Sequence, residues 1–78
     1  YKIRVNAIEP GWIQTPGSTG EMSAEEIAEV ENGRIPWGRV GYAEDIGKAV
    51  AFLVSDDADY ITSTALRVDG GLIAAAEH

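Results

Sequence analysis

The run from Ile3 to Ile8, closed by Pro10 and Gly11, limits the possible folds more than any other stretch of the chain. A short apolar segment of this kind predicts a buried strand. Pro10 cannot donate a hydrogen bond to a neighbouring strand, and Gly11 tolerates backbone angles that other residues avoid, so the strand should end there. The residues that follow, as far as Thr15, are expected to form a loop at the carboxyl end of a strand. In open α/β sheets this is the edge where ligands bind.

Two later segments have the residue spacing of helices. The first is predicted from Ala24 to Asn32, because Ser23 and Glu26 are spaced as a capping box and Gly33 is a typical helix stop. The second is predicted from Ala43 to Ser55, because its apolar residues recur every three or four positions and so form one core-facing stripe. The residues of that stripe are Ile46, Ala49, Val50, Leu53 and Val54.

A second strand is expected from Ala65 to Val68, closed by a turn at Asp69, Gly70 and Gly71 where glycine permits left-handed backbone. Strand, helices and strand in this order form a parallel crossover unit, which is right-handed in nearly all proteins. Two parallel strands alone leave unpaired edges, and these helices are too few to cover both faces. The sequence therefore predicts an α/β fold in which residues 1–78 are one segment, without separate domains, at the end of a larger doubly wound parallel sheet.

Composition excludes several classes of partner. The 78 residues carry a formal net charge of −7, so neither a nucleic acid nor an anionic membrane is expected as a partner. They contain no cysteine, so neither a disulfide nor a thiolate metal site is expected. No apolar run approaches the roughly 20 residues of a membrane span, and we expect a cytoplasmic protein. The acidic run Asp56, Asp57 and Asp59 has too few oxygen ligands for a calcium loop, so helix-end and turn roles are expected and no metal. The glutamates of the first helix are expected to form a solvated face: Glu25, Glu26, Glu29 and Glu31.

Several blocks of the sequence resemble the short-chain dehydrogenases/reductases, in the order and at the spacing of that family. They are Ile3–Ile8, Pro10–Ile13 with Thr15, Ile35–Arg39, Glu44–Ile46, Ala49–Asp56, Asp59–Thr62 and Leu66–Gly71. The segment from Trp12 to Gly17 is most similar to members called glucose 1-dehydrogenase. Ser63 departs from the pattern, because the family often has glycine there, and Ala43 stands where the family often has proline.

The resemblance implies a Rossmann-type sheet that binds NAD or NADP and transfers a hydride between the nicotinamide and a small alcohol or carbonyl substrate. It also implies that the loop after the first strand lies beside the nicotinamide ring. The backbone of Ile13 would bond the carboxamide, and the hydroxyl of Thr15 would contact the carboxamide or the phosphates. The cofactor-binding residues implied in this way are Pro10, Gly11, Trp12, Ile13 and Thr15.

Two parts of the family's machinery are absent from these residues. The glycine-rich phosphate turn, G-x-G-x-x-G, does not occur. The family's catalytic serine and its Tyr-x-x-x-Lys pair lie upstream of the strand that opens this chain, and Tyr1-Lys2 does not have that spacing. No catalytic residue is therefore expected here, and the chain is expected to be inactive without the rest of its parent domain. The choice between NAD and NADP also depends on residues outside these 78.

Three further expectations concern segments around this loop. The helix after Ser23, with glycines near both ends, resembles a substrate lid. In relatives, the last strand and the helix at 43–55 lie at a two-fold interface, which implies a homo-tetramer or homodimer. Two of these residues also have a simpler possible role: Thr15 as a cap of the following turn, and Trp12 as a packing residue rather than part of a substrate pocket.

Two other classes of function stay open at this point. One is a non-catalytic Rossmann-type protein that uses the fold for binding or assembly, which the upstream Tyr-x-x-x-Lys pair would exclude. The other is an independent acidic protein of 78 residues, for which a cooperative thermal melt of the isolated chain as a folded monomer would be evidence.

Overall fold

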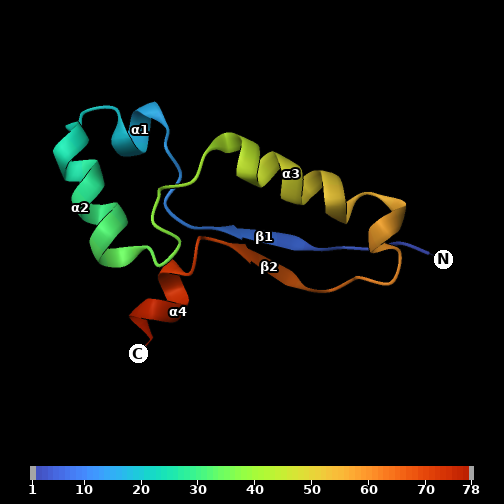
Figure 1. Ribbon diagram of the computed structural model, residues 1–78. Coiled ribbons are helices and arrows are strands. Elements are labelled where there is room, and N and C mark those ends of the chain that lie inside the picture. Colours follow the sequence, from blue (N-terminus) through green and yellow to red (C-terminus); the bar gives the residue numbers. More distant parts are fainter. Residues whose placement is uncertain (1, 78) are drawn as a thin grey trace.

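The computed structural model of the protein describes residues 2–77. Its sheet consists of two parallel strands, β1 (Ala7–Pro10) and β2 (Ala65–Val68), paired from Ala7 opposite Ala65 to Pro10 opposite Val68. Helix α3 (Ala43–Leu53) lies along one face of this pair (Figure 1). The predicted parallel crossover between the two strands is confirmed.

The predicted bounds of the first strand were wrong. β1 begins at Ala7 instead of Ile3, although it ends at Pro10, where the sequence places the stop. The residues before it make single hydrogen bonds instead of a regular ladder: the Val5 N–H donates to Thr62 Oγ1 at 3.2 Å, and the Val5 carbonyl accepts the Ser63 N–H at 2.7 Å. Ile3 and Val5 are 75% and 70% exposed, so this segment is not buried in the described residues 2–77.

The predicted helices form, with corrected ends. Helix α2 (Ala24–Arg34) begins at the expected capping box, in which Ser23 and Glu26 exchange two hydrogen bonds of 3.1 Å. The helix continues through Gly33, so the predicted stop was wrong; the backbone turns extended only at Ile35. Helix α3 has its predicted start and ends at Leu53, two residues before Ser55. The bounds of β2 are those predicted.

Three short helices were not expected from the sequence. They are α1 (Pro16–Thr19), the 3-10 turn η1 (Asp56–Ala58) and α4 (Leu72–Ala76). Gly70 and Gly71 have φ angles of 62° and 91°, so the predicted left-handed turn after β2 is confirmed, and it leads directly into α4. The Asp59 N–H donates to the Asp56 carbonyl at 3.1 Å, which confirms the turn role of this acidic run.

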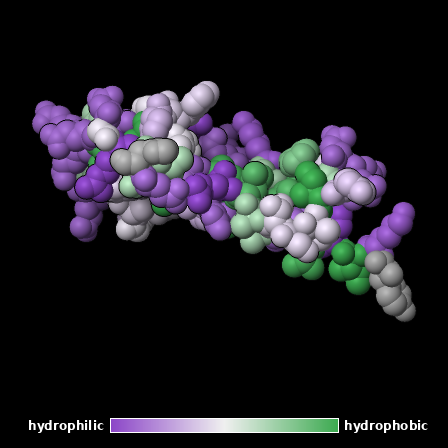
Figure 2. Space-filling view, turned by 90° about the horizontal axis from the view of Figure 1, so that it is seen from below, coloured by the Kyte–Doolittle hydropathy of each residue, from purple (hydrophilic) through white to green (hydrophobic). Residues whose placement is uncertain are grey.

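The described residues bury few apolar side chains: Ile35, Val40, Leu53 and Ala58. The molecule measures 50 × 29 × 17 Å with a radius of gyration of 14.7 Å, whereas a compact domain of this size has about 11–12 Å. Hydrophobic side chains gather over the strand half, and the end that carries α2 is mainly hydrophilic (Figure 2). An elongated shape with so few buried side chains is typical of a segment that packs against further strands and helices of a larger sheet.

Across residues 2–77, every helix falls short of the length and apolar character that a membrane span requires.

Candidate functional site

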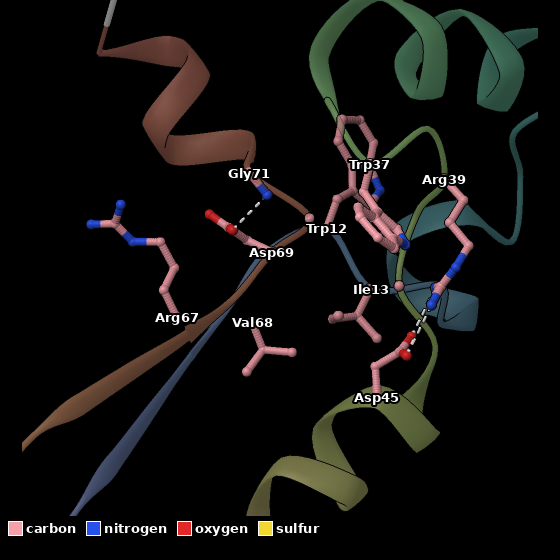
Figure 3. Close-up of a pocket in the computed structure, with 11 residues that line it drawn as sticks. Trp12, Ile13, Trp37, Arg39, Asp45, Arg67, Val68, Asp69 and Gly71 are labelled. Atoms are coloured by element: carbon pink, nitrogen blue, oxygen red, sulfur yellow. Dashed lines mark hydrogen bonds and ion pairs between the residues drawn. The ribbon is translucent and has the colours of Figure 1, made fainter.

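A cavity of about 340 Å³ opens at the carboxyl ends of the two strands (Figure 3). Three segments form it: the loop after β1, the connection between α2 and α3, and the end of β2. Their lining residues are Trp12 and Ile13; Trp37, Arg39, Gly41 and Asp45; and Arg67 to Gly71. This is the edge of the sheet where the sequence places a ligand site.

Gly41 holds the loop after β1 by a parallel backbone bridge to Ile13. The Gly41 N–H donates to the Trp12 carbonyl at 2.8 Å, and the Gly41 carbonyl accepts from the Gln14 N–H at 2.7 Å. In extended backbone the N–H and C=O groups of successive residues point to opposite sides. The N–H of Ile13 therefore points away from Gly41, and none of the hydrogen bonds among residues 2–77 uses it as a donor.

Two glycines permit the close approaches that shape this loop. A Cβ on Gly41 would lie 2.7 Å from Cδ1 of Ile13, so a larger residue would press on the bridge. A Cβ on Gly11 would lie 2.7 Å from Cα of Asp69, which belongs to the turn after β2. The structural reason for Gly11 is thus contact between the two strand ends, a reason the sequence did not supply.

An ion pair fixes the connection that carries Gly41. The guanidinium of Arg39 donates two hydrogen bonds to the Asp45 carboxylate, at 2.9 and 3.0 Å (Figure 3). The same carboxylate accepts the Tyr42 N–H at 2.7 Å, at the start of α3. The hydrogen bonds from Arg39, followed by that from Tyr42, lower the pKa of Asp45 to about 2. Asp45 in turn raises the pKa of Arg39.

Asp69 ties the end of β2 to α4. One carboxylate oxygen accepts the Gly71 N–H at 2.9 Å, and the other accepts the Ile73 N–H at 3.0 Å. Desolvation acts to raise the pKa of Asp69, but the N–H groups of Ile73 and Gly71 act against it, and the pKa is lowered overall. Asp69 therefore stays ionised and caps the first turn of α4.

The predicted cofactor residues do not form one cluster. Trp12 and Ile13 line the cavity, whereas Pro10 and Gly11 lie at the end of β1 and its pairing with β2. Thr15 is the N-cap of α1: its hydroxyl accepts the Ser18 N–H at 3.2 Å, so the plainer capping role is confirmed. Thr15 lines a separate hollow against α2.

Trp12 combines packing with a polar atom that needs a partner. Its side chain and that of Trp37 both line the cavity (Figure 3), and the Trp12 indole Nε1 is buried without a hydrogen-bond partner in the part of the chain that the structure describes. A buried donor of this kind costs free energy unless an acceptor meets it.

Sequence reasoning missed the residues that position the loop. Arg39 and Asp45 are six residues apart across a helix start, a spacing that predicts no contact by itself. Glu31 was assigned to a solvated face, but its carboxylate accepts the Val40 N–H at 3.0 Å and holds α2 against this connection. The acidic first turn of α3 was a usable signal for Asp45, because carboxylates there bond the first N–H groups of a helix.

Comparison with known proteins identifies the family. A family model described as enoyl-(acyl carrier protein) reductase matches residues 1–73. The 3-oxoacyl-acyl-carrier-protein reductase of Haemophilus influenzae is 51% identical over 70 residues, which cover 90% of this chain and 28% of that protein. The chain belongs to the short-chain dehydrogenase/reductase family.

Other members of this family differ in the substrates they are named for. The L-rhamnose 1-dehydrogenase (NAD(P)(+)) of Azotobacter vinelandii is 43% identical over 72 residues, covering 92% of this chain and 28% of that protein. A crystal structure described as a 2-deoxy-D-gluconate 3-dehydrogenase from Agrobacterium tumefaciens, with bound NADP, matches with a TM-score of 0.76 at 43% identity. That match covers 91% of this chain and 29% of the other.

These matches confirm the predicted fold class and the predicted cofactor class, NAD or NADP. The fold is part of a Rossmann-type α/β sheet, and NADP is bound in the solved relative. The chain spans about 28% of the length of the curated relatives, so the activity of a whole protein is a matter for proposal.

Proposed function

We propose that the full-length protein is an NAD(P)-dependent oxidoreductase that transfers a hydride between a nicotinamide cofactor and a small alcohol or carbonyl substrate. In this proposal the present residues supply the loop beside the nicotinamide, a substrate lid and a subunit interface, and they are inactive alone. The catalytic serine, tyrosine and lysine come from upstream. Family membership and the NADP in a solved relative support the reaction class.

One observation in this chain carries the proposed cofactor contact. The peptide groups on both sides of Ile13 are fixed by Gly41, while the Ile13 N–H points the other way and has no acceptor among residues 2–77. A fixed, unpaired backbone donor at the carboxyl end of a strand fits the oxygen of an amide such as the nicotinamide carboxamide. When bound, NAD or NADP supplies the hydride chemistry, and the chain supplies orientation.

The other cofactor residues have smaller parts in this proposal. Pro10 and Gly11 set the direction in which the loop leaves β1, and Trp12 closes the cavity beside Ile13. Thr15 is retained as a contact, but its hydroxyl is engaged with Ser18, so that bond must rearrange for a cofactor group to receive it.

The test is to remove the Ile13 N–H in the full-length protein. Ile13→Pro deletes this donor, and Ile13→Val keeps it with a similar branched side chain. We expect Ile13→Pro to weaken NAD(P)H binding roughly three- to tenfold, which corresponds to the net contribution of one hydrogen bond. Ile13→Val should change NAD(P)H binding less than about twofold. Binding of ADP-ribose or its 2′-phosphate, which lack the nicotinamide, should be unchanged in both variants.

The reaction class needs its own assay. NAD(P)H oxidation by the full-length protein is followed by absorbance with a panel of small ketones and aldehydes. Turnover of a carbonyl supports the proposal. Cofactor binding without any turnover would favour the non-catalytic binding or assembly protein, and no binding of NAD(P)H would refute the oxidoreductase.

The lid proposal rests on α2. No α2 side chain is fully buried, which suits a segment that opens and closes, and Glu31 ties its far end to Val40. Of the glycines expected as hinges, Gly17 lies inside α1 and Gly33 inside α2, whereas Gly20 lies between the two helices. Hydrogen exchange of the full-length protein with and without cofactor tests the lid: equal protection of residues 18–34 in both states would exclude it.

The interface proposal rests on α3 and β2. β2 has one free edge among the described strands, and Phe52 on α3 is 44% exposed. A homo-tetramer or homodimer that pairs these elements would cover both. Light scattering of the full-length protein measures its mass, and a clean monomer would contradict the assembly. A cytoplasmic location belongs to the same proposal, and fractionation of cells that express the protein tests it.

A further inference from the structure

We propose that Arg39 and Asp45 act as positioning residues for the cofactor loop, because their ion pair sets the direction of the Ile13 N–H. This inference rests on the proposed function. It adds two residues, outside the loop and outside the predicted site, that orient a donor they do not touch.

Hydrogen bonds of the ion pair fix the shape of the segment between Arg39 and Asp45. Both oxygens of Asp45 accept from the guanidinium, at 2.9 and 3.0 Å, and one also accepts the Tyr42 N–H at 2.7 Å. Arg39 Nη1 additionally donates to the Val40 carbonyl at 3.1 Å. These hydrogen bonds thus hold the segment on both sides of Gly41. A bidentate pair of this geometry fixes orientation as well as distance.

Gly41, in the middle of this segment, holds the loop after β1. The N–H and carbonyl of Gly41 hold the Trp12 carbonyl and the Gln14 N–H. These two bonds fix the rotation of the peptide groups on either side of Ile13. Because Val40 is almost fully buried and its N–H is held by Glu31, the segment cannot shift without breaking packing as well.

The ion pair affects the Ile13 N–H through Gly41, without contacting it. Arg39 and Asp45 have side chains that are 41% and 27% exposed, which gives an ion pair of this kind little weight in overall stability. Its geometric effect is larger, since a fixed donor loses less freedom when it meets its acceptor. The pair should therefore affect nicotinamide binding more than folding.

The experiment compares variants of the full-length protein in two binding assays. Asp45→Asn keeps the size of the side chain and one acceptor oxygen but removes the bidentate ion pair. Arg39→Lys keeps the positive charge but removes the two parallel N–H donors of the guanidinium. Glu44→Gln is the matched control: it removes the same charge one residue earlier in the first turn of α3. The ligands are NAD(P)H and the corresponding ADP-ribose compound without nicotinamide.

We expect Asp45→Asn and Arg39→Lys to weaken NAD(P)H binding roughly three- to tenfold, with ADP-ribose binding unchanged and Glu44→Gln like the wild type. Asp45→Asn added to Ile13→Pro should cause no further loss, because both changes act through one N–H.

Three outcomes would overturn the inference. If NAD(P)H binding by Asp45→Asn and Arg39→Lys equals the wild type while Ile13→Pro weakens it, the pair does not position the donor. If both variants lose NAD(P)H and ADP-ribose affinity equally, the role is structural. If Ile13→Pro itself has no effect, the proposed cofactor contact fails, and the inference fails with it.

Discussion

The two ends of the β1–β2 pair are held by different kinds of contact. At the amino end, a long side chain supplements backbone bonds such as that from the Ser63 N–H to the Val5 carbonyl: the Arg4 guanidinium donates to the carbonyls of Leu53 at 2.7 Å, Ile61 at 3.3 Å and Ser55 at 3.4 Å. At the carboxyl end, backbone bonds backbone through Gly41, and a partly exposed ion pair shapes the connection.

The contacts at the amino end stabilise the fold, whereas those at the carboxyl end orient a backbone donor. Arg4 meets the carbonyl of Leu53, the last residue of α3, which has no partner within the helix and lies at the negative end of its dipole. Its contacts therefore join α3 to the approach of β2 and contribute to stability. At the opposite end the contacts leave the Ile13 N–H unpaired and fixed, which is what a ligand site needs.

The largest expected effect is at the carboxyl end, from Gly11→Ala. The new Cβ would lie 2.7 Å from Cα of Asp69, and backbone cannot move aside cheaply, so the two strand ends must separate. We expect the free energy of unfolding of the full-length protein to fall by about 2–3 kcal/mol, the cost of overpacking with a backbone shift. Urea denaturation measures this loss.

Gly33→Ala is the matched control for that change. Gly33 lies in α2 and a Cβ there meets nothing within 4 Å, so alanine should stabilise the helix by about 0.5–1 kcal/mol. Equal effects of the two substitutions would show that the strand ends are not in close contact.

The second-largest loss of stability is expected from a substitution at the amino end of the strand pair. Arg4→Gln removes the donors that reach Leu53, Ser55 and Ile61, and we expect a loss of about 1–2 kcal/mol in the free energy of unfolding. NAD(P)H affinity should not change, because the donor loop lies at the other end of the strands. A drop in cofactor affinity with unchanged stability would reverse the assignment of the two ends.

The sequence was informative where a pattern is local. The capping box of Ser23 and the turn at Gly70 each depend on neighbours within a few residues, and each formed as predicted. Helix α3 also begins where its stripe predicts, but the stripe is not buried as a whole: Leu53 is buried, whereas Val50 is 44% exposed and Val54, past the end of the helix, is 73% exposed. The start of β1 failed because apolar character alone cannot say which residues find a strand partner. Helices of four or five residues such as α1 show too little periodicity to predict.

The candidate site divides in the same way. The resemblance pointed to Trp12 and Ile13, which share the cavity, but it could not show that Thr15 faces Ser18 or that Gly11 meets Asp69. The ion pair of Arg39 joins residues on either side of a turn. Only the fold brings such residues together.

A smaller effect, of opposite sign, is expected at Ser63. This residue has a φ of 59°, the left-handed region that side chains disfavour, and its N–H donates to the Val5 carbonyl at 2.7 Å. Ser63→Gly should relieve this strain and raise the free energy of unfolding by about 0.5–1 kcal/mol. Ser63→Ala keeps a Cβ and should give no gain, so stabilisation by both variants would exclude strain as the cause.

The smallest effect on stability is expected from Asp45, and it depends on pH. Hydrogen bonds from Arg39 and then Tyr42 lower the pKa of Asp45 to about 2, with Lys48 adding a weaker attraction, whereas an unfolded aspartate titrates near pH ~3.9. Because the folded pKa is the lower one, the stabilisation is complete above about pH 4 and is lost as the pH falls towards 2. The difference in Tm between the wild type and Asp45→Asn should therefore shrink over that interval, which a pH series of thermal melts measures. A difference that stayed constant with pH would mean that the variant acts through packing. A small, pH-dependent loss of stability beside a several-fold loss of NAD(P)H affinity would separate positioning from anchoring at the level of a single carboxylate.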